Sequence, residues 1–312
     1  MHYLRNLYIL FIVLSLNIFF FSTTKVLAKS FEINDIEISK PFENNFNKNI
    51  VIDTGFKEAF SKLIQTIIRS ADYKKVKNIK LNEIKAMVDS FSIKEEKFID
   101  QNYYVNLGVS FNKKKIFKYL ERKNIFPSQI IKEKFLFIPI IIDENDNDLK
   151  IFSNNLVYEK WNTINQEYYL INYLLPTEDL EDLSIIKKNY DLIENYDFKE
   201  IIKKYYLENC IIALFFKNGQ EVRILSKIIT KNKVVINNDS FPEFDLQNEE
   251  KINSLISKLK NTYEDTWKNY NQINTSIKLP IVLRVDNQNF TKLIKFENTL
   301  SELDLVSHFS IK

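Results

Sequence analysis

Two acidic clusters are the strongest candidates for chemistry in this 312-residue chain. The first, Glu178 to Asp182, follows Pro176 at the expected start of a helix. Carboxylates at that position stabilise the helix dipole. Paired carboxylates also act as acid and base in hydrolases. Helix capping is therefore the expected role of the cluster, and hydrolysis is the alternative.

The second cluster, Asp143 to Asp148, has the spaced acids that begin a calcium-binding loop. It lacks the glycine that such a loop carries at its sixth position, and Asn154 replaces the glutamate at its twelfth. A polar loop between two strands is the better interpretation. One cysteine and one histidine outside the leader cannot form a usual zinc site. The sequence predicts no metal-binding residue and no cofactor.

Nucleophilic catalysis has no recognisable set of residues. Cys210 opens the apolar run 210–216, which predicts a buried hydrophobic side chain. His308 lies in an expected terminal strand without a partnering Ser, Cys or Asp pattern. None of the three glycines stands in a phosphate-binding loop. We therefore assign no catalytic and no cofactor-binding residue, and we expect a protein that is not an enzyme.

The first 28 residues have the layout of a secretory signal. Arg5 precedes an apolar stretch over 7–21, and Val26 and Ala28 occupy the −3 and −1 positions of a cut between Ala28 and Lys29. The apolar stretch is shorter than the ~20 residues that span a bilayer. We expect cleavage, a periplasmic location and membrane contact through the leader alone. An uncleaved leader that anchors the protein in the inner membrane is the alternative.

The charge balance excludes binding that depends on phosphate contacts. Of 44 basic residues, Arg5 and Lys25 belong to the leader, which leaves 42 against 41 acidic residues. Nucleic-acid-binding proteins usually carry a basic excess on one face. The sequence shows no such excess, so no nucleic-acid partner is expected.

Hydrophobic periodicity predicts an α/β to α+β fold with small mixed sheets flanked by helices in two or three closely packed modules. After the signal peptide (1–28), residues 29–127 read as a β-α-α-β-β-α module, and 128–247 as a central α/β module. Residues 248–312 read as a long helix followed by a terminal β-α-β unit, with strands over 277–285 and 303–311.

Three stretches, in order, are similar to a known family. They are the helix with Ala59, Phe60, Leu63, Ile67 and Ile68-Arg69-Ser70; the strand Tyr103 to Phe111 with the helix to Leu120; and the segment from Phe137-Ile138-Pro139-Ile140 through Asn154 or Asn155, Trp161, Leu174-Leu175-Pro176, Asp179, Leu180 and Asp182 to Lys203-Lys204-Tyr205. They resemble an uncharacterised family of Gram-negative envelope proteins, domain of unknown function 2066. The family's usual glycine after the Arg69 position is missing here. The resemblance implies a periplasmic location and no established activity.

These expectations favour a non-enzymatic binding or assembly module of the cell envelope. Its partner is expected to be an envelope protein, bound by strand addition to an exposed edge of the first module or to the terminal unit. A periplasmic hydrolase of unrecognised type is the alternative. The sequence does not indicate an oligomeric state.

Overall fold

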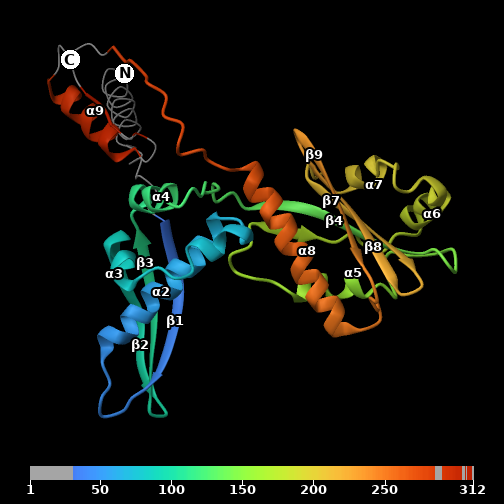
Figure 1. Ribbon diagram of the computed structural model, residues 1–312, viewed down its shortest axis with the longest axis horizontal. Coiled ribbons are helices and arrows are strands. Elements are labelled where there is room, and N and C mark those ends of the chain that lie inside the picture. Colours follow the sequence, from blue (N-terminus) through green and yellow to red (C-terminus); the bar gives the residue numbers. More distant parts are fainter. Residues whose placement is uncertain (1–30, 285–289, 304–305, 307, 311–312) are drawn as a thin grey trace, which may run out of the picture.

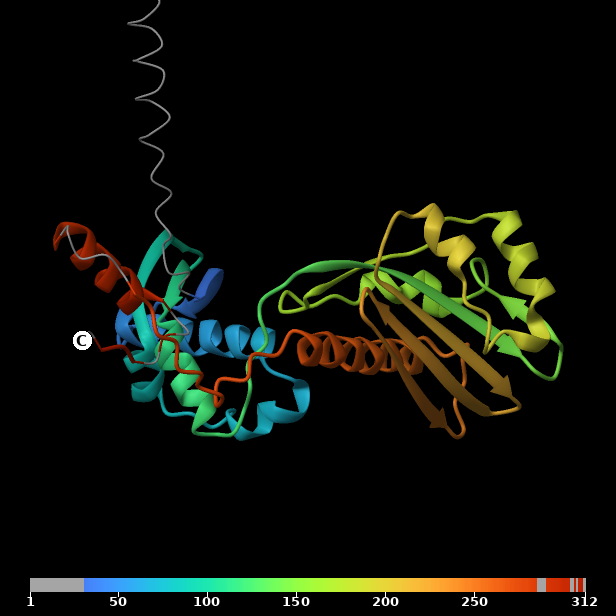
Figure 2. The ribbon, with the colours of Figure 1, turned by 90° about the horizontal axis from the view of Figure 1, so that it is seen from above.

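The computed structural model describes residues 31–284, 290–303, 306 and 308–310. Two separate β-sheets each carry packed helices, which confirms an α+β protein. Figures 1 and 2 show the two bodies side by side, with helix α8 (Glu249–Tyr270) reaching from the second towards the first. The leader, including the expected cut between Ala28 and Lys29, lies outside the described residues. Of the helices that are described, none combines the length and apolarity needed to cross a bilayer.

The first module has the predicted β-α-α-β-β-α order. Its elements are β1 (Phe31–Pro41), α2 (Lys48–Ile67), α3 (Leu81–Met87), β2 (Val88–Ile99), β3 (Asn102–Phe111) and α4 (Lys113–Glu121). The sheet is antiparallel, with β3 between β1 and β2. Both β1 and β2 are therefore edge strands.

Helix α2 forms because its apolar residues recur every three or four positions. Ala59, Leu63 and Ile67 on this stripe are fully buried against the inner face of the sheet. Gly55 allows a close approach, since a Cβ at this position would lie 2.4 Å from Cδ1 of Leu107 on β3. The helix consequently packs on β1 and β3 and leaves the inner side of β2 less covered.

The second module is a six-stranded mixed sheet. Its strands are β4 (Glu133–Asp143), β5 (Asp148–Lys150), β6 (Ile171–Leu174), β7 (Cys210–Asn218), β8 (Glu221–Thr230) and β9 (Lys233–Phe241), and its helices are α5 (Leu156–Lys160), α6 (Leu180–Lys188) and α7 (Lys199–Lys204). Strand β4 runs parallel to β6 and β7, whereas β7, β8 and β9 form an antiparallel meander. Gly219, with a φ of +60°, makes the predicted turn between β7 and β8.

Helices cover both faces of this sheet. Residues of α6 and α7 pack on one face, and α5 with α8 packs on the other. Strands β4 and β7 are thus buried on both sides, as their continuous apolar runs require. The sequence places the long helix α8 in a separate C-terminal unit, 248–312. In the structure, this helix completes the core of the second module.

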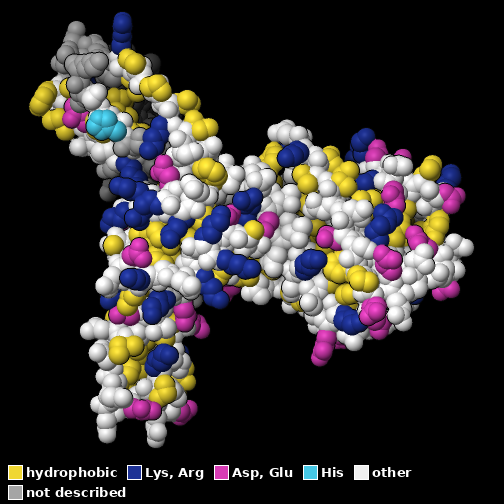
Figure 3. All heavy atoms as spheres, viewed as in Figure 1, with side chains coloured by type: hydrophobic (Ala, Val, Ile, Leu, Met, Phe, Trp, Pro, Cys, Tyr) yellow, Lys and Arg dark blue, Asp and Glu magenta, His cyan; other side chains and the backbone are white. Residues whose placement is uncertain are grey.

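In the expected terminal β-α-β unit the first strand is wrong, and the second, over 303–311, lies partly outside the described residues. Residues 277–284 form no strand, and neither do the described residues after α9 (Phe290–Glu302). The segment 277–284 has the apolar composition of a strand, but no described strand pairs with it. Its side chains lie exposed along the surface between α8 and α9 (Figure 3). The helix over 290–300 is confirmed.

Hydrogen bonds join the two modules where α8 ends. Both carboxylate oxygens of Asp265 accept from Ser70, one from its N–H at 2.7 Å and one from its hydroxyl at 2.6 Å. Lys268 donates to the Gln65 carbonyl near the end of α2 at 2.6 Å, and Gln272 donates to the Phe126 carbonyl at 3.2 Å. This polar junction also includes one apolar contact, that of Ile273 with the core of the first module.

Candidate functional site

The strongest candidate surface is the edge strand β2. The backbone of this twelve-residue strand forms hydrogen bonds to β3 along one edge. Along its other edge, no described strand pairs with it. Every residue of β2 is exposed or half-buried, whereas β3 is mostly buried. A long edge strand presents unpaired N–H and C=O groups that can pair with another chain.

A row of apolar side chains follows the inner side of β2. Phe91, Ile93 and Phe98 lie opposite the buried residues Val109, Leu107 and Tyr103 of β3. They face the α2 side of the sheet yet stay exposed, Phe91 by 46% and Phe98 by 58%. We call Phe91, Ile93 and Phe98 the β2 row.

Aromatic neighbours fix both ends of the β2 row. The Phe91 ring meets the Phe56 ring of α2 edge-on at 5.2 Å between centroids. At the other end, the Phe98 ring lies 5.0 Å from the rings of Phe42 and Tyr103. Phe42 is itself half exposed, so the apolar surface continues beyond the strand. The first module shows such hydrophobic patches between charged side chains in Figure 3.

Charged side chains on β2 are already paired within the chain. Lys48 of α2 binds Glu96 at 2.8 Å, and the hydrogen bond from Lys48 lowers the pKa of the Glu96 carboxyl. Asp35 binds Lys94 at 3.2 Å, and Glu95 binds Lys97 at 3.1 Å. Asp89 is the exception, since its carboxylate accepts a hydrogen bond from the Asn112 amide. The edge thus carries one unbalanced negative charge, and its recognition chemistry is mainly backbone pairing with apolar contact.

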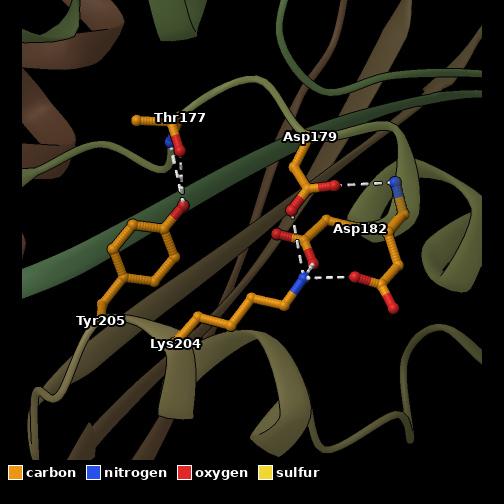
Figure 4. A network of polar contacts seen from close by, with 6 residues as sticks. Thr177, Asp179, Asp182, Lys204 and Tyr205 are labelled. Atoms are coloured by element: carbon orange, nitrogen blue, oxygen red, sulfur yellow. Dashed lines mark hydrogen bonds and ion pairs between the residues drawn. The ribbon is translucent and has the colours of Figure 1, made fainter.

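The acidic cluster before α6 caps the helix, as predicted. Asp179 accepts the N–H of Glu181 at 2.8 Å. Figure 4 shows the Lys204 ammonium between three carboxylates, 3.1 Å from Asp179, 3.1 Å from Glu181 and 2.6 Å from Asp182. Beside it, the Thr177 N–H donates to the Tyr205 hydroxyl at 2.9 Å. Lys204 and Tyr205 end α7, so the cluster fastens α7 to the start of α6.

The electrostatics of this cluster are those of a structural ion network. Hydrogen bonds from Lys204 hold the pKa of Asp179 below its usual value, and Asp182 raises the pKa of Lys204 in return. A general acid in a hydrolase needs the opposite shift, a carboxyl whose pKa is raised. The arrangement therefore gives the hydrolase alternative no support.

The loop Asp143 to Asp148 joins β4 to β5, as predicted. Asp143 is buried and accepts a hydrogen bond from the Lys217 ammonium at 2.6 Å. It also accepts hydrogen bonds from the backbone N–H groups of Asn145 and Asp146. The Lys217 hydrogen bond lowers the pKa of Asp143. Over the described residues, no group of His, Cys, Asp and Glu side chains is arranged to hold a metal ion.

Cys210 and His308 offer no nucleophile or base. Cys210 is fully buried at the start of β7, and burial raises the pKa of its thiol, as expected for a core residue. His308 is exposed and lies in no strand, because the expected terminal strand is absent from the described part of the C-terminus.

Sequence reasoning missed a row of charged residues on α8. Lys260, Glu264 and Lys268 recur every fourth position on the buried side of the helix, and all three are almost fully buried. These three residues have the same spacing as the apolar residues of α8. That shared spacing was the signal in the sequence that could have placed them on the buried side. Lys260 lines a cavity of the second module together with Tyr173.

These features define a two-module α+β protein with an uncovered, apolar edge strand. The sequence matches no family model. A search of curated proteins also finds no match. The resemblance to the envelope family stays a prediction that rests on the stretches named above.

Proposed function

We propose that the protein is a non-enzymatic binding or assembly module of the cell envelope. The observation that carries this function is the exposed β2 edge with its apolar row. Strand addition to such an edge supplies main-chain hydrogen bonds for affinity and side-chain contacts for specificity. The secretory layout of residues 1–28 and the resemblance to envelope proteins support export to the periplasm.

The partner is an envelope protein that presents an extended segment with apolar residues at alternate positions. Side chains in a strand alternate between faces, so a segment paired with β2 places every second residue over the β2 row. All charged groups of β2 except Asp89 are engaged by Asp35, Lys48 and one another, so apolar contact matters more for the segment than a high net charge. A second copy of this chain is the competing occupant.

The test is photo-crosslinking in intact cells with a photoreactive residue at the exposed position Ser92, in the wild-type chain and two variants. Ile93→Lys places a charge on the β2 row and should abolish the crosslinked partner, since inward-pointing charges block edge pairing. Ile236→Lys is the matched control, because Ile236 lies exposed on β9, an edge strand of the second sheet. It should leave the crosslink intact.

Three results would contradict this function. They are a crosslink that survives Ile93→Lys, a crosslink that is lost in Ile236→Lys alone, and a crosslink to a second copy of this chain. Mass spectrometry of the purified protein tests the leader at the same time. An amino terminus at Lys29 is expected, whereas an intact leader would favour a membrane anchor.

A further inference from the structure

The second module contains a cavity of about 770 Å³ beside the N-terminal ends of β4 and β6. Its walls come from residues 132–134 and 162–173 and from the side chain of Lys260 on α8. The rim is rich in hydrogen-bonding side chains, namely Asn162, Asn165, Gln166, Asn172, Glu133 and Glu167. This lining suits a polar ligand more than an apolar one.

The Lys260 ammonium is buried with little to accept its protons. It donates to the Ile164 carbonyl at 2.5 Å, which uses one of its three donors. Its nitrogen lies 5.2 Å from the ring centre of Trp161 and 4.8 Å from that of Tyr173. Aromatic faces stabilise a cation but accept no ordinary hydrogen bond. Two ammonium donors therefore remain for another acceptor.

Two further donors in the same cluster lack acceptors. The Tyr173 hydroxyl and the Trp161 indole N–H are buried, and neither has a hydrogen-bond partner within the described residues. The two rings meet edge-on at 5.3 Å, so both groups belong to the cluster around Lys260. Buried donors without partners destabilise the free protein. The cluster has more donors than acceptors.

The nearest buried carboxylate is already occupied. Glu264 lies one turn along α8 from Lys260, and its oxygens accept the N–H groups of Leu170 at 2.9 Å and Ile171 at 2.8 Å. Its charge holds the end of the loop onto β6 and does not form an ion pair with Lys260. The missing complement of the cluster is an acceptor, preferably an anionic one.

We propose that this cavity binds a small monocarboxylate with a hydroxylated body. The carboxylate accepts hydrogen bonds from the Lys260 ammonium and the Tyr173 hydroxyl, and the rim carboxamides bind the hydroxyl groups. One carboxylate charge matches one buried ammonium. Phosphate groups are commonly bound by arginine forks or helix N-termini, and the lining residues include no arginine.

Burial of Lys260 supports this assignment. Desolvation lowers the pKa of Lys260 to about 8, with Glu264 opposing the shift. In the protein without ligand, burial therefore makes the charged form of Lys260 unfavourable. A bound carboxylate would lower that cost, so ligand binding and protonation of Lys260 should favour each other.

The test measures thermal unfolding and calorimetric binding of the full chain with D-glucuronate, and with D-glucose as its neutral counterpart, at constant ionic strength. Glucuronate should raise the melting temperature at millimolar concentration, whereas glucose should not. Lys260→Met should remove the effect. Tyr173→Phe deletes the hydroxyl without changing the ring, and it should weaken glucuronate binding about fivefold, as expected for the loss of one hydrogen bond.

Several outcomes would overturn the proposal. They are an equal effect of glucose and glucuronate, no effect of glucuronate at tens of millimolar, an equal effect of inorganic phosphate, or a glucuronate effect that persists in Lys260→Met. If Lys260→Met does not fold, unchanged glucuronate affinity in Tyr173→Phe would overturn it. The Ile93→Lys variant should bind glucuronate normally, so this site and the β2 edge can fail separately.

Discussion

Two lysines of the second module illustrate how surroundings decide the role of one residue type. Lys204 is partly exposed among three carboxylates, with Asp182 raising its pKa most. Lys260 lies among aromatic rings, where burial lowers its pKa to about 8. The first lysine is held as a cation, and the second is close to losing its proton at mildly alkaline pH.

Lys260 should make the stability of the protein rise with pH. Its pKa falls from 10.5 in the unfolded chain to about 8 in the folded protein. Between these values the unfolded chain binds more protons, so the free energy of unfolding increases by up to ~1.4 kcal/mol per pH unit. Relative to Lys260→Met, the wild type should gain about 1.5 kcal/mol from pH 8 to about pH 9.5, measured by urea unfolding.

Lys204→Met provides the control for this pH dependence. Because the folded pKa of Lys204 is raised above 10.5, the proton is bound in both states below that pH. The difference between wild type and Lys204→Met should therefore stay constant from pH 7 to about pH 9.5. Parallel curves for the wild type and Lys260→Met would contradict the buried-lysine assignment.

Capping was predictable from sequence at the residue scale, and the partners of the capping residues were not. Asp179 after a proline at a helix start is a local signal, and the structure confirms it. Lys204 lies 22 residues after Asp182, and Lys260 lies 96 residues after Ile164. No local pattern connects residues that far apart, because the fold alone brings them together.

At the scale of elements, Glu264 ties α8 to the start of β6. Replacement by Ala would leave the N–H groups of Leu170 and Ile171 without their buried acceptor. We expect a loss of about 2–4 kcal/mol in the free energy of unfolding, since each orphaned donor costs about 1–3 kcal/mol. Chemical denaturation measures this loss.

Glu264→Gln is the matched variant. One oxygen of Glu264 accepts from both N–H groups, so a glutamine oxygen can keep both contacts, while the glutamine nitrogen replaces the second oxygen that also accepts from Leu170. The substitution also removes a carboxyl whose pKa is raised by burial. Glu264→Gln should be clearly less destabilising than Glu264→Ala. Equal losses would show that the N–H groups do not depend on this acceptor.

Elements with strong periodicity were predicted well, and the strand expected over 277–285 was not. Helix α8 and strands β3, β4 and β7 carry long, regular apolar patterns. Each pattern can be buried by only one type of secondary structure. Residues 277–284 also carry a strand-like apolar composition. A strand needs a neighbour to complete its hydrogen bonds, and no described strand supplies one. Composition alone cannot indicate whether that neighbour exists.

At the scale of the whole molecule, the sequence indicated modules without indicating how they join. It lacks a Pro-, Gly- or Ser-rich linker, from which tight packing was expected. The structure instead joins the modules through hydrogen bonds at the end of α8 and the segment 126–129. Ser128 donates to the Ile67 carbonyl at 2.7 Å, and Ile273 donates to the Pro127 carbonyl at 2.8 Å. A polar junction of this kind resembles an interface between domains more than a core.

The polar junction should set the angle between the modules with little effect on the stability of either one. Asp265→Ala with Gln272→Ala removes three hydrogen bonds to the first module. Spin labels on cysteines at the exposed positions Ser92 and Asn238 report the distance between modules, because the native Cys210 is buried.

The double variant should broaden that distance distribution, while each module keeps its hydrogen-exchange protection. Asn261→Ala is the control, since Asn261 accepts from Tyr169 inside the second module and should leave the distribution unchanged. An unchanged distribution in the double variant would mean that the remaining contacts, the backbone hydrogen bonds at 127–129 and the Lys268 hydrogen bond to Gln65, suffice to hold the modules. In that case the protein would present β2 and the Lys260 cavity in one fixed arrangement.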